Sequence, residues 1–265
     1  MIMRTITYTT DIHYHLQTGN ANPLLNDVLC VVLKEGQVLL RIGEHLCEYA
    51  PMILLLSVPF GGTMLSLCEM ERQILGYYNL ATKTERVAGI TWYAEAWTEC
   101  EMLASLYKLP VTTVVGMVAA LSPRNRWSFN VTDAEQVITN GENASVHTYP
   151  ANLAKAVRIL NGEQPTDVLR GNKVCAFYKC LLDAETYEVC VDGHAYGVAC
   201  GFGERVKVKT ITDTAYERIS TAYANTANRL GLQPRQLQAT TWLTYRRIHN
   251  IYWGLSWFPH SLLRS

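Results

Sequence analysis

The chain has 265 residues, with 23 basic and 23 acidic side chains, and 49% of its residues are hydrophobic. This length accommodates one large domain, or one domain with an appendage, and the apolar fraction excludes a wholly disordered protein. The longest apolar run, residues 51–60, is too short to span a bilayer and contains Pro59. The N-terminus also lacks the basic start and apolar core of a secretion signal. We therefore expect a soluble, cytoplasmic protein.

Eight cysteines are spread along the chain without a CxxC pair, which is too sparse for a disulfide scaffold. We expect reduced thiols, most of them buried. The spacing of Cys175, Cys180, Cys190 and Cys200 matches no zinc or iron–sulfur pattern. The sequence therefore predicts no metal site and no other cofactor.

The charge is unevenly distributed along the chain. Residues 1–150 contain 9 Lys or Arg and 14 Asp or Glu, whereas residues 151–265 contain 14 and 9. A basic C-terminal half suits a surface that binds a polyanion such as nucleic acid. An uneven scatter of solvated charge is the alternative interpretation.

The N-terminal part of the chain is β-leaning. Residues 28–42 contain two apolar runs around Lys34-Glu35-Gly36-Gln37, a pattern typical of a β-hairpin. Gly61-Gly62 marks a break, and from about residue 69 the pattern becomes helical. We predict a mainly α protein with a small N-terminal mixed or β-rich extension of unknown role over residues 1–68 and a helical domain over residues 69–265.

The helical part is predicted to hold eight or nine helices. Pro150 and Pro234 suit the first position of a helix, and Thr214 with Glu217 has the spacing of a capping box. Residues 165–169 are expected to form only a short turn. After the first helix, the predicted helical segments are residues 86–108, 111–121, 126–139, 150–160, 174–182, 193–200, 214–230 and 234–250.

The first segment with chemical potential runs from Leu169 to Lys173 (LRGNK). Gly171, just before a helix, lets backbone amides approach a phosphate, and the helix N-terminus favours an anion. Lys173 falls in the first helical turn, an unfavourable place for a cation, which points to a functional reason for it. It could contact a phosphate or act as an amine nucleophile. The alternative is an ordinary surface lysine.

The second segment runs from Cys190 to Ala195 (CVDGHA). The apolar lead-in places Asp192 at the N-cap of a helix, and this role alone would explain an aspartate. A catalytic carboxylate is the other interpretation. His194 could likewise be a packed or capping histidine rather than a functional one.

Together the two segments resemble the helix–hairpin–helix DNA glycosylases of the endonuclease III type. In that family a hairpin of the form L-P-G-V-G-x-K-T-A carries a lysine, and a later V-D-T-H-x-x-R-V segment carries an aspartate. Gly171-Asn172-Lys173 matches G-x-K, and Val191-Asp192-Gly193-His194 matches V-D-T-H with Gly193 in place of threonine. The hairpin's leading proline and first glycine are absent. Because no cysteine follows Cys200, we expect no C-terminal four-cysteine cluster.

Two further stretches agree with this resemblance, which covers residues 86–250. Residues 120–125 (ALSPRN) resemble the family segment that fills the hole left by a flipped base. Thr241-Trp242-Leu243, followed by Arg246-Arg247, resembles the closing helix. The chain also looks like a group of phage and plasmid-borne proteins with L-S-P-x-x-x-W and V-D-x-H-A segments.

The resemblance implies a helix–hairpin–helix glycosylase-like helical fold and an enzyme that flips a damaged or modified base out of DNA and excises it. Asp192 would stabilise the developing sugar cation. Lys173 would either give abasic-site lyase activity or only contact phosphate. By analogy, the substrate could be a hypermodified phage base and the role antiviral defence. We expect double-stranded DNA as the partner, no membrane association, and a monomer.

The remaining site residues are assigned by position. Arg124 or Asn125 would fill the gap left by the flipped base, although either could instead cap a helix or lie on the surface. The other predicted DNA contacts are Arg170, Gly171, Asn172 and His194. The predicted base pocket consists of five aromatic residues, whose faces could stack on a base but which could also belong to the core: Trp127, Tyr149, Phe177, Tyr178 and Trp242.

Two other functions fit the same sequence. One is a non-catalytic helix–hairpin–helix DNA-binding protein, in which Asp192 is only an N-cap. The other is an all-α phage or plasmid interaction protein without a DNA role.

Overall fold

The computed structural model describes residues 28–34, 37–42, 45–49, 65–201 and 210–251. The chain divides into two compact units, Met1–Ser57 and Val58–Ser265, and each is described by itself.

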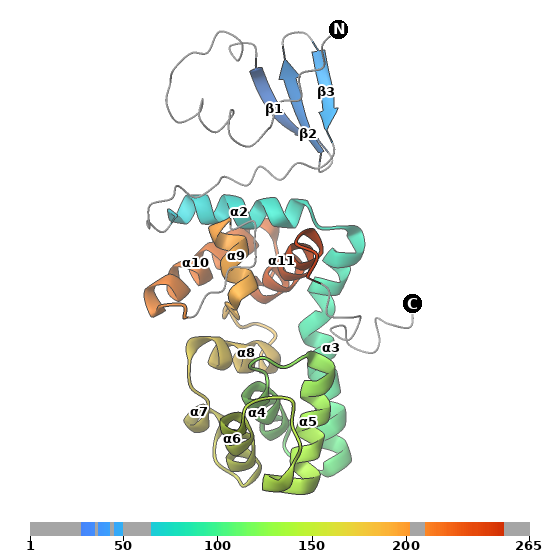
Figure 1. Cartoon of the computed structure of the whole chain (residues 1–265), viewed down its shortest axis with the longest axis vertical. Coiled ribbons are helices and arrows are strands. Elements are labelled where there is room, and N and C mark those ends of the chain that lie inside the picture. The colour runs from blue at the N-terminus through green and yellow to red at the C-terminus, as the bar shows by residue number, and fades with distance from the viewer. Residues whose placement is uncertain (1–27, 35–36, 43–44, 50–64, 202–209, 252–265) are drawn as a thin grey trace. The chain divides into compact units, whose positions relative to one another are not determined.

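The described part of the first unit is a three-stranded antiparallel sheet in the order β1-β2-β3 (Figure 1). Its strands are β1 (Val28–Lys34), β2 (Gln37–Ile42) and β3 (His45–Tyr49). β1 and β2 are the two segments that the sequence predicts as a hairpin, and Val31 pairs with Leu40 across them.

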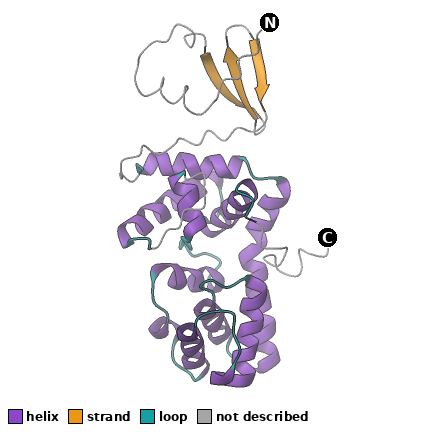
Figure 2. Ribbon diagram, viewed as in Figure 1, coloured by secondary structure: helices purple, strands orange, loops and turns teal. Residues whose placement is uncertain are grey.

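The described part of the second unit is helical, with no strand in residues 65–201 and 210–251 (Figure 2). The predicted mainly α class is thus confirmed. None of the helices in this part is long and apolar enough to cross a membrane. In chain order the helices are α2 (Leu67–Asn79), α3 (Lys83–Tyr107), α4 (Val111–Leu121), α5 (Trp127–Asn140), the 3-10 helix η1 (Gly141–Asn143), α6 (Pro150–Leu160), α7 (Pro165–Val168), α8 (Asn172–Leu182), α9 (Gly193–Cys200), α10 (Asp213–Leu230) and α11 (Pro234–Ile248).

Most helix boundaries follow local signals in the sequence. Pro150 and Pro234 occupy the first turns of α6 and α11, as predicted. The predicted turn at residues 165–169 is instead the one-turn helix α7, which also begins with proline.

The predicted capping box of Thr214 and Glu217 is wrong. Thr212 is the N-cap of α10, because its backbone is extended and its hydroxyl accepts a hydrogen bond from the Ala215 N–H. Thr214 already lies within the first helical turn, where its side chain cannot cap.

The helices of the second unit form two groups that share α3 (Figure 1). One group contains α2, α9, α10 and α11, and the other contains α4 to α8. α4 lies at the centre of the second group: every residue from Val114 to Leu121 is buried, which explains a helix that is apolar on all sides. The connection from α8 to α9 crosses from one group to the other.

α3 and α11 approach each other very closely at Gly89. A Cβ atom placed on Gly89 would lie 2.2 Å from Thr240 Oγ1 and 2.5 Å from the Thr240 backbone. The missing side chain therefore sets the distance between the shared helix and the closing helix.

We predict that Gly89→Ala destabilises the protein by about 1–3 kcal/mol, because the added methyl group meets backbone that cannot move aside. Gly76→Ala is the matched control, since a Cβ atom placed on this exposed glycine of α2 would have no other atom within 4 Å. Alanine there should be neutral or stabilise by up to about 1 kcal/mol. Urea denaturation followed by circular dichroism measures both. Equal free energies of unfolding for Gly89→Ala and Gly76→Ala would contradict the close approach of α3 and α11 at Gly89.

Candidate functional site

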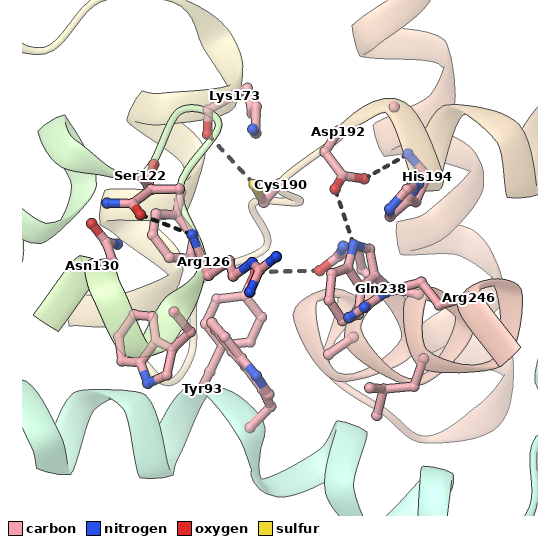
Figure 3. Close-up of a pocket in the computed structure, with 18 of the residues that line it drawn as sticks. Tyr93, Ser122, Arg126, Asn130, Lys173, Cys190, Asp192, His194, Gln238 and Arg246 are labelled. Carbon is pink, nitrogen blue, oxygen red and sulfur yellow. Dashed lines mark hydrogen bonds between the residues drawn. The ribbon is translucent and has the colours of Figure 1, made fainter. Parts of the chain in front are cut away.

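A cavity of about 620 Å³ lies between the two groups of helices (Figure 3). Its lining residues come from α3, the α4–α5 connection, α5, α8, the start of α9, and α11. Eight of the thirteen predicted site residues line it: Arg124, Asn125, Trp127, Lys173, Phe177, Asp192, His194 and Trp242. The other five, which do not line it, are Tyr149, Arg170, Gly171, Asn172 and Tyr178.

The Asp192 carboxylate is held by three donors. Its Oδ1 accepts hydrogen bonds from the backbone N–H groups of His194 (3.0 Å) and Ala195 (2.8 Å), so the predicted N-cap is confirmed. Its Oδ2 accepts a third hydrogen bond, at 3.0 Å, from Trp242 Nε1 on α11. The capping of α9 accounts for the hydrogen bonds of Oδ1 but not for the hydrogen bond of Oδ2. The second oxygen is held by a side chain of another helix that also lines the cavity.

Lys173 enters the same cavity from the N-terminus of α8. The preceding Gly171 has φ of 86°, a conformation that other L-residues rarely adopt, and this turn begins the helix. Among the described residues, no ion pair within 4.0 Å joins Lys173 to Asp192. The ammonium and the carboxylate thus face one cavity without neutralising each other directly.

The pKa of the Cys190 thiol is affected by both Lys173 and Asp192. Burial raises the pKa of this thiol to about 12; Lys173 lowers it and Asp192 raises it. Figure 3 shows Cys190 between Lys173 and Asp192 in that view. At neutral pH the thiol stays protonated, so it is not a nucleophile of this site.

A buried hydroxyl from α10 joins the two segments that carry Lys173 and Asp192. The Tyr216 hydroxyl donates to the carbonyl oxygen of Val189 at 2.6 Å and accepts from the N–H of Val191 at 3.2 Å. The carbonyl oxygen of Asn172 lies 3.3 Å from the same hydroxyl. The hydroxyl therefore lies where the start of α8 meets the residues that lead into Asp192.

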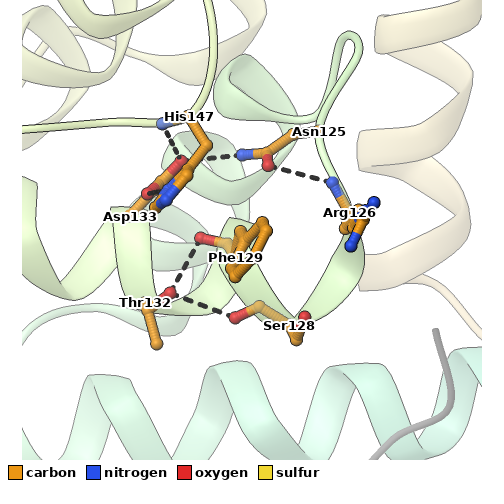
Figure 4. A network of polar contacts seen from close by, with 7 residues as sticks. All are labelled: Asn125, Arg126, Ser128, Phe129, Thr132, Asp133 and His147. Atoms are coloured by element: carbon orange, nitrogen blue, oxygen red, sulfur yellow. Dashed lines mark hydrogen bonds and ion pairs between the residues drawn. The ribbon is translucent and has the colours of Figure 1, made fainter. Parts of the chain in front are cut away.

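The loop before α5 is fixed by a buried carboxylate (Figure 4). Asp133, whose side chain is 1% exposed, accepts hydrogen bonds from Asn125 Nδ2 and the His147 N–H, each at 2.8 Å. His147 Nδ1 lies 2.8 Å from its other oxygen. Asn125 also accepts the Arg126 N–H, so its amide is fully engaged in shaping the loop.

Arg124 differs from its neighbour Asn125. It is exposed, has φ of 59°, and its guanidinium lies 5.7 Å from the Tyr149 ring centroid. A non-glycine residue in this conformation is strained and is held by the surrounding loop. Of the two predicted gap-filling residues, the geometry favours Arg124.

Aromatic rings form one wall of the cavity. Trp92 lies 5.2 Å from Trp127 and 4.8 Å from Tyr93, measured between ring centroids. Trp92 and Tyr93 were not predicted as site residues, because in the middle of a long helix nothing in the sequence distinguishes them from core residues. Tyr149, by contrast, is 49% exposed, and Tyr178 is part of the core.

Four polar or charged lining residues were also missed by the sequence analysis: Arg126, Asn130, Gln238 and Arg246. Gln238 and Arg246 precede and follow Trp242 by four residues, so a projection of the closing helix would have placed them on its face. Asn130 donates to the carbonyl of Val118 at 3.0 Å, whereas its buried Oδ1 has no hydrogen-bond partner.

The predicted DNA contacts of the α7–α8 turn are partly engaged within the protein. Asn172 Nδ2 donates to Asp213 Oδ1 at 2.8 Å, and the exposed Arg170 donates to the carbonyl oxygens of Thr166 and Leu169. The glycine turn and the amides at the start of α8 are the part of this turn where an anion would be favoured.

In the part of the chain that the structure describes, no group of three or more His, Cys, Asp or Glu side chains could hold a metal ion. The six cysteines in residues 65–201 are free thiols, and four of them are buried.

These features define a helical protein with an interhelical cavity in which, among the described lining residues, one acidic side chain lies among basic and aromatic ones. The chain belongs to a family of unknown function, DUF7178, whose model matches residues 61–249. The match includes every residue that lines the cavity. Comparisons with curated proteins and with solved structures give no significant match.

We predict that Tyr216→Phe lowers the free energy of unfolding by about 0.5–1.5 kcal/mol, because the Val189 carbonyl and the Val191 N–H lose the buried hydroxyl and keep only the 3.0 Å hydrogen bond that joins them to each other. Tyr187→Phe removes the same atom from a side chain that is 76% exposed and should change stability by less than about 0.5 kcal/mol. Chemical denaturation of both variants tests this. Equal losses, or none in Tyr216→Phe, would show that the hydroxyl does not join the two segments.

Proposed function

We propose that the protein is a DNA glycosylase that draws a modified or damaged base into the cavity and cleaves its glycosidic bond. The observation that supports this most strongly is that Lys173 and Asp192 line one aromatic-walled cavity although they come from different groups of helices. The volume of about 620 Å³ suits a nucleoside, since small-molecule pockets range from about 300 to 1,000 Å³.

Asp192 has the surroundings that a charge-stabilising carboxylate needs. As the bond between the base and sugar C1′ breaks, the base leaves with the bonding electron pair and positive charge develops on the sugar. A carboxylate fixed by three donors can stabilise that charge without reorganising. In the hydrolytic route, water supplies hydroxide to C1′ and a proton to the departing base.

Lys173 offers a second route. Its amine would attack C1′ in place of water, and the base would leave with the bonding electron pair. Loss of a proton from Nζ, breaking of the C1′–O4′ bond and protonation of O4′ would then give a Schiff base between Nζ and the ring-opened sugar. β-Elimination of the 3′ phosphate would then cut the strand. Alternatively, Lys173 only binds a phosphate and water is the nucleophile.

Other lining residues support the extrusion of a base. Trp92, Trp127 and Trp242 provide rings on which a base could stack. The unpaired Oδ1 of Asn130 could accept a hydrogen bond from a base N–H, which would satisfy a buried acceptor. Arg124, exposed on its strained loop, would occupy the space that the base vacates.

A second candidate is a non-catalytic DNA-binding protein. The observation that favours it is the capping of α9 by Asp192 Oδ1, which gives this carboxylate a structural role without any reaction. Such a protein would bind duplex DNA in a salt-dependent manner and release no base.

We expect Asp192→Asn to slow base release by at least about 10²-fold while duplex binding persists, because asparagine also caps helices but carries no charge. The assay is a panel of modified-base duplexes, read as abasic sites and nicks. Asp167→Asn, at an exposed position of α7, is the control and should retain wild-type rates. Binding without base release by the wild-type protein would favour the second candidate. No binding at low salt would favour a role outside DNA.

For Lys173, we predict that borohydride traps a covalent complex between the wild-type protein and a substrate duplex, and that Lys173→Gln abolishes the trap. Lys179→Gln, on the same helix, should leave it intact, since Lys179 pairs with Glu188 away from the cavity. If bases are released but nothing is trapped, the amine binds a phosphate and the reaction is hydrolytic.

A further inference from the structure

The cavity carries more positive charge than contact with a DNA backbone requires. Among the described side chains that line it, Arg124, Arg126, Lys173 and Arg246 are basic, and only Asp192 is acidic. The whole chain has equal numbers of basic and acidic residues, so this excess is local. Such a balance favours a ligand that brings negative charge into the cavity.

Two of the four basic residues lie where a DNA strand would pass. Arg124 is exposed on the loop before α5, and Lys173 lies in the first turn of α8, next to the glycine turn. These positions suit the phosphates that flank an extruded nucleotide. Contact with these phosphates does not account for the other two basic residues, Arg126 and Arg246.

Arg246 is buried, with 9% of its surface exposed. Its guanidinium lies 4.5 Å from the centroid of the Trp242 ring and donates to the carbonyl oxygen of Ile251 at 3.1 and 3.3 Å. Contacts of this kind orient a guanidinium without cancelling its charge. A phosphodiester outside the cavity mouth is poorly placed to reach so buried a group.

Arg126 approaches from the opposite wall. It is the N-cap residue of α5, and Figure 3 shows its side chain reaching toward α11, the helix that carries Arg246. The pKa of Arg246 is lowered to about 10 by burial and further by Arg126, while Asp192 raises it. The two guanidinium groups therefore lie within electrostatic range of each other and of the carboxylate.

We propose that Arg126 and Arg246 form an anion subsite that accepts an acidic substituent on the extruded base. This inference rests on the proposed glycosylase function and specifies its substrate class as a base that carries a carboxylate or a similar anionic group. Arginine is suited to this task, because its planar fork of donors matches the two oxygens of a carboxylate. A cavity of about 620 Å³ leaves space for a substituent beside the base ring.

The test compares duplexes that differ only in the charge of one substituent. The matched probes are 5-carboxyuracil against 5-carbamoyluracil and 5-carboxycytosine against 5-carbamoylcytosine, which have nearly the same shape. Single-turnover excision and equilibrium binding are measured for each. We expect the wild-type protein to prefer the carboxylate of a pair by about 10- to 100-fold, the range for hydrogen bonds to charged groups.

Three variants assign this preference to the subsite. Arg126→Gln and Arg246→Gln should reduce the carboxylate-to-amide ratio to near one, and Arg246→Lys should retain part of it. Arg124→Gln should weaken both members of a pair equally, because this residue would contact DNA rather than the substituent. Arg158→Gln, an exposed position paired with Glu163, controls for charge in general and should change neither. Arg126 is only partly buried, so its variant remains informative if Arg246→Gln fails to fold.

The outcomes separate this inference from the function on which it rests. Excision or binding of both members of each pair with equal efficiency would overturn the anion subsite and leave the glycosylase proposal intact. A wild-type preference that Arg126→Gln retains in full would overturn the assignment to these residues. Proportional losses for both probes in the Arg126 and Arg246 variants would mean that these residues bind backbone phosphate instead. Failure to bind or excise any probe or any base of the wider panel would overturn both proposals.

Discussion

The geometry of the site depends on one buried hydroxyl. The Tyr216 hydroxyl of α10 lies within 3.3 Å of backbone atoms of Asn172, which precedes Lys173, and of Val189 and Val191, which precede Asp192. Lys173 and Asp192 lie at the starts of α8 and α9, so the orientation of each side chain depends on how the start of its helix is anchored. A hydrogen bond between two main-chain segments is well suited to this, because the peptide groups it satisfies cannot turn to water in a buried site. The two groups of helices are also joined through α3, the α8–α9 connection, and hydrogen bonds from Asn172 to Asp213 and from Arg235 to the Cys180 carbonyl.

The electrostatics of the cavity follow from how each charge is supported. The Asp192 carboxylate is compensated by dipoles, namely two backbone amides and an indole N–H, rather than by a neighbouring cation. Among the described residues, Lys173 forms no ion pair with it within 4.0 Å. Dipoles of this kind are fixed by the fold and need not rearrange when a ligand enters. The cavity can in this way hold the Asp192 carboxylate and basic side chains close together and still accept a further charged group.

Much of the helical architecture was predictable because the controlling signals are local. Proline at helix starts, the apolar pattern of α4 and the N-cap at Asp192 each act within one turn of chain, and the structure has them as predicted. The pair Lys173 and Asp192 was also found from sequence, since each lies in a short recognisable segment. Trp92, Tyr93, Arg126 and Asn130 were not found, because their role depends on which helices pack together. The same holds for Tyr216, whose contacts lie 25 to 44 residues away in sequence.

The position of the aromatic wall on α3 has a consequence for how the protein responds to occupancy. Trp92 and Tyr93 belong to α3, the helix that both groups of helices share, and the other lining residues come from both groups, so a molecule in the cavity would contact α3 and both groups together. Because only the assembled fold presents this surface, binding shifts the folding equilibrium of both halves at once. A molecule that binds there would therefore raise the stability of the whole helical unit by an amount set by its concentration and affinity.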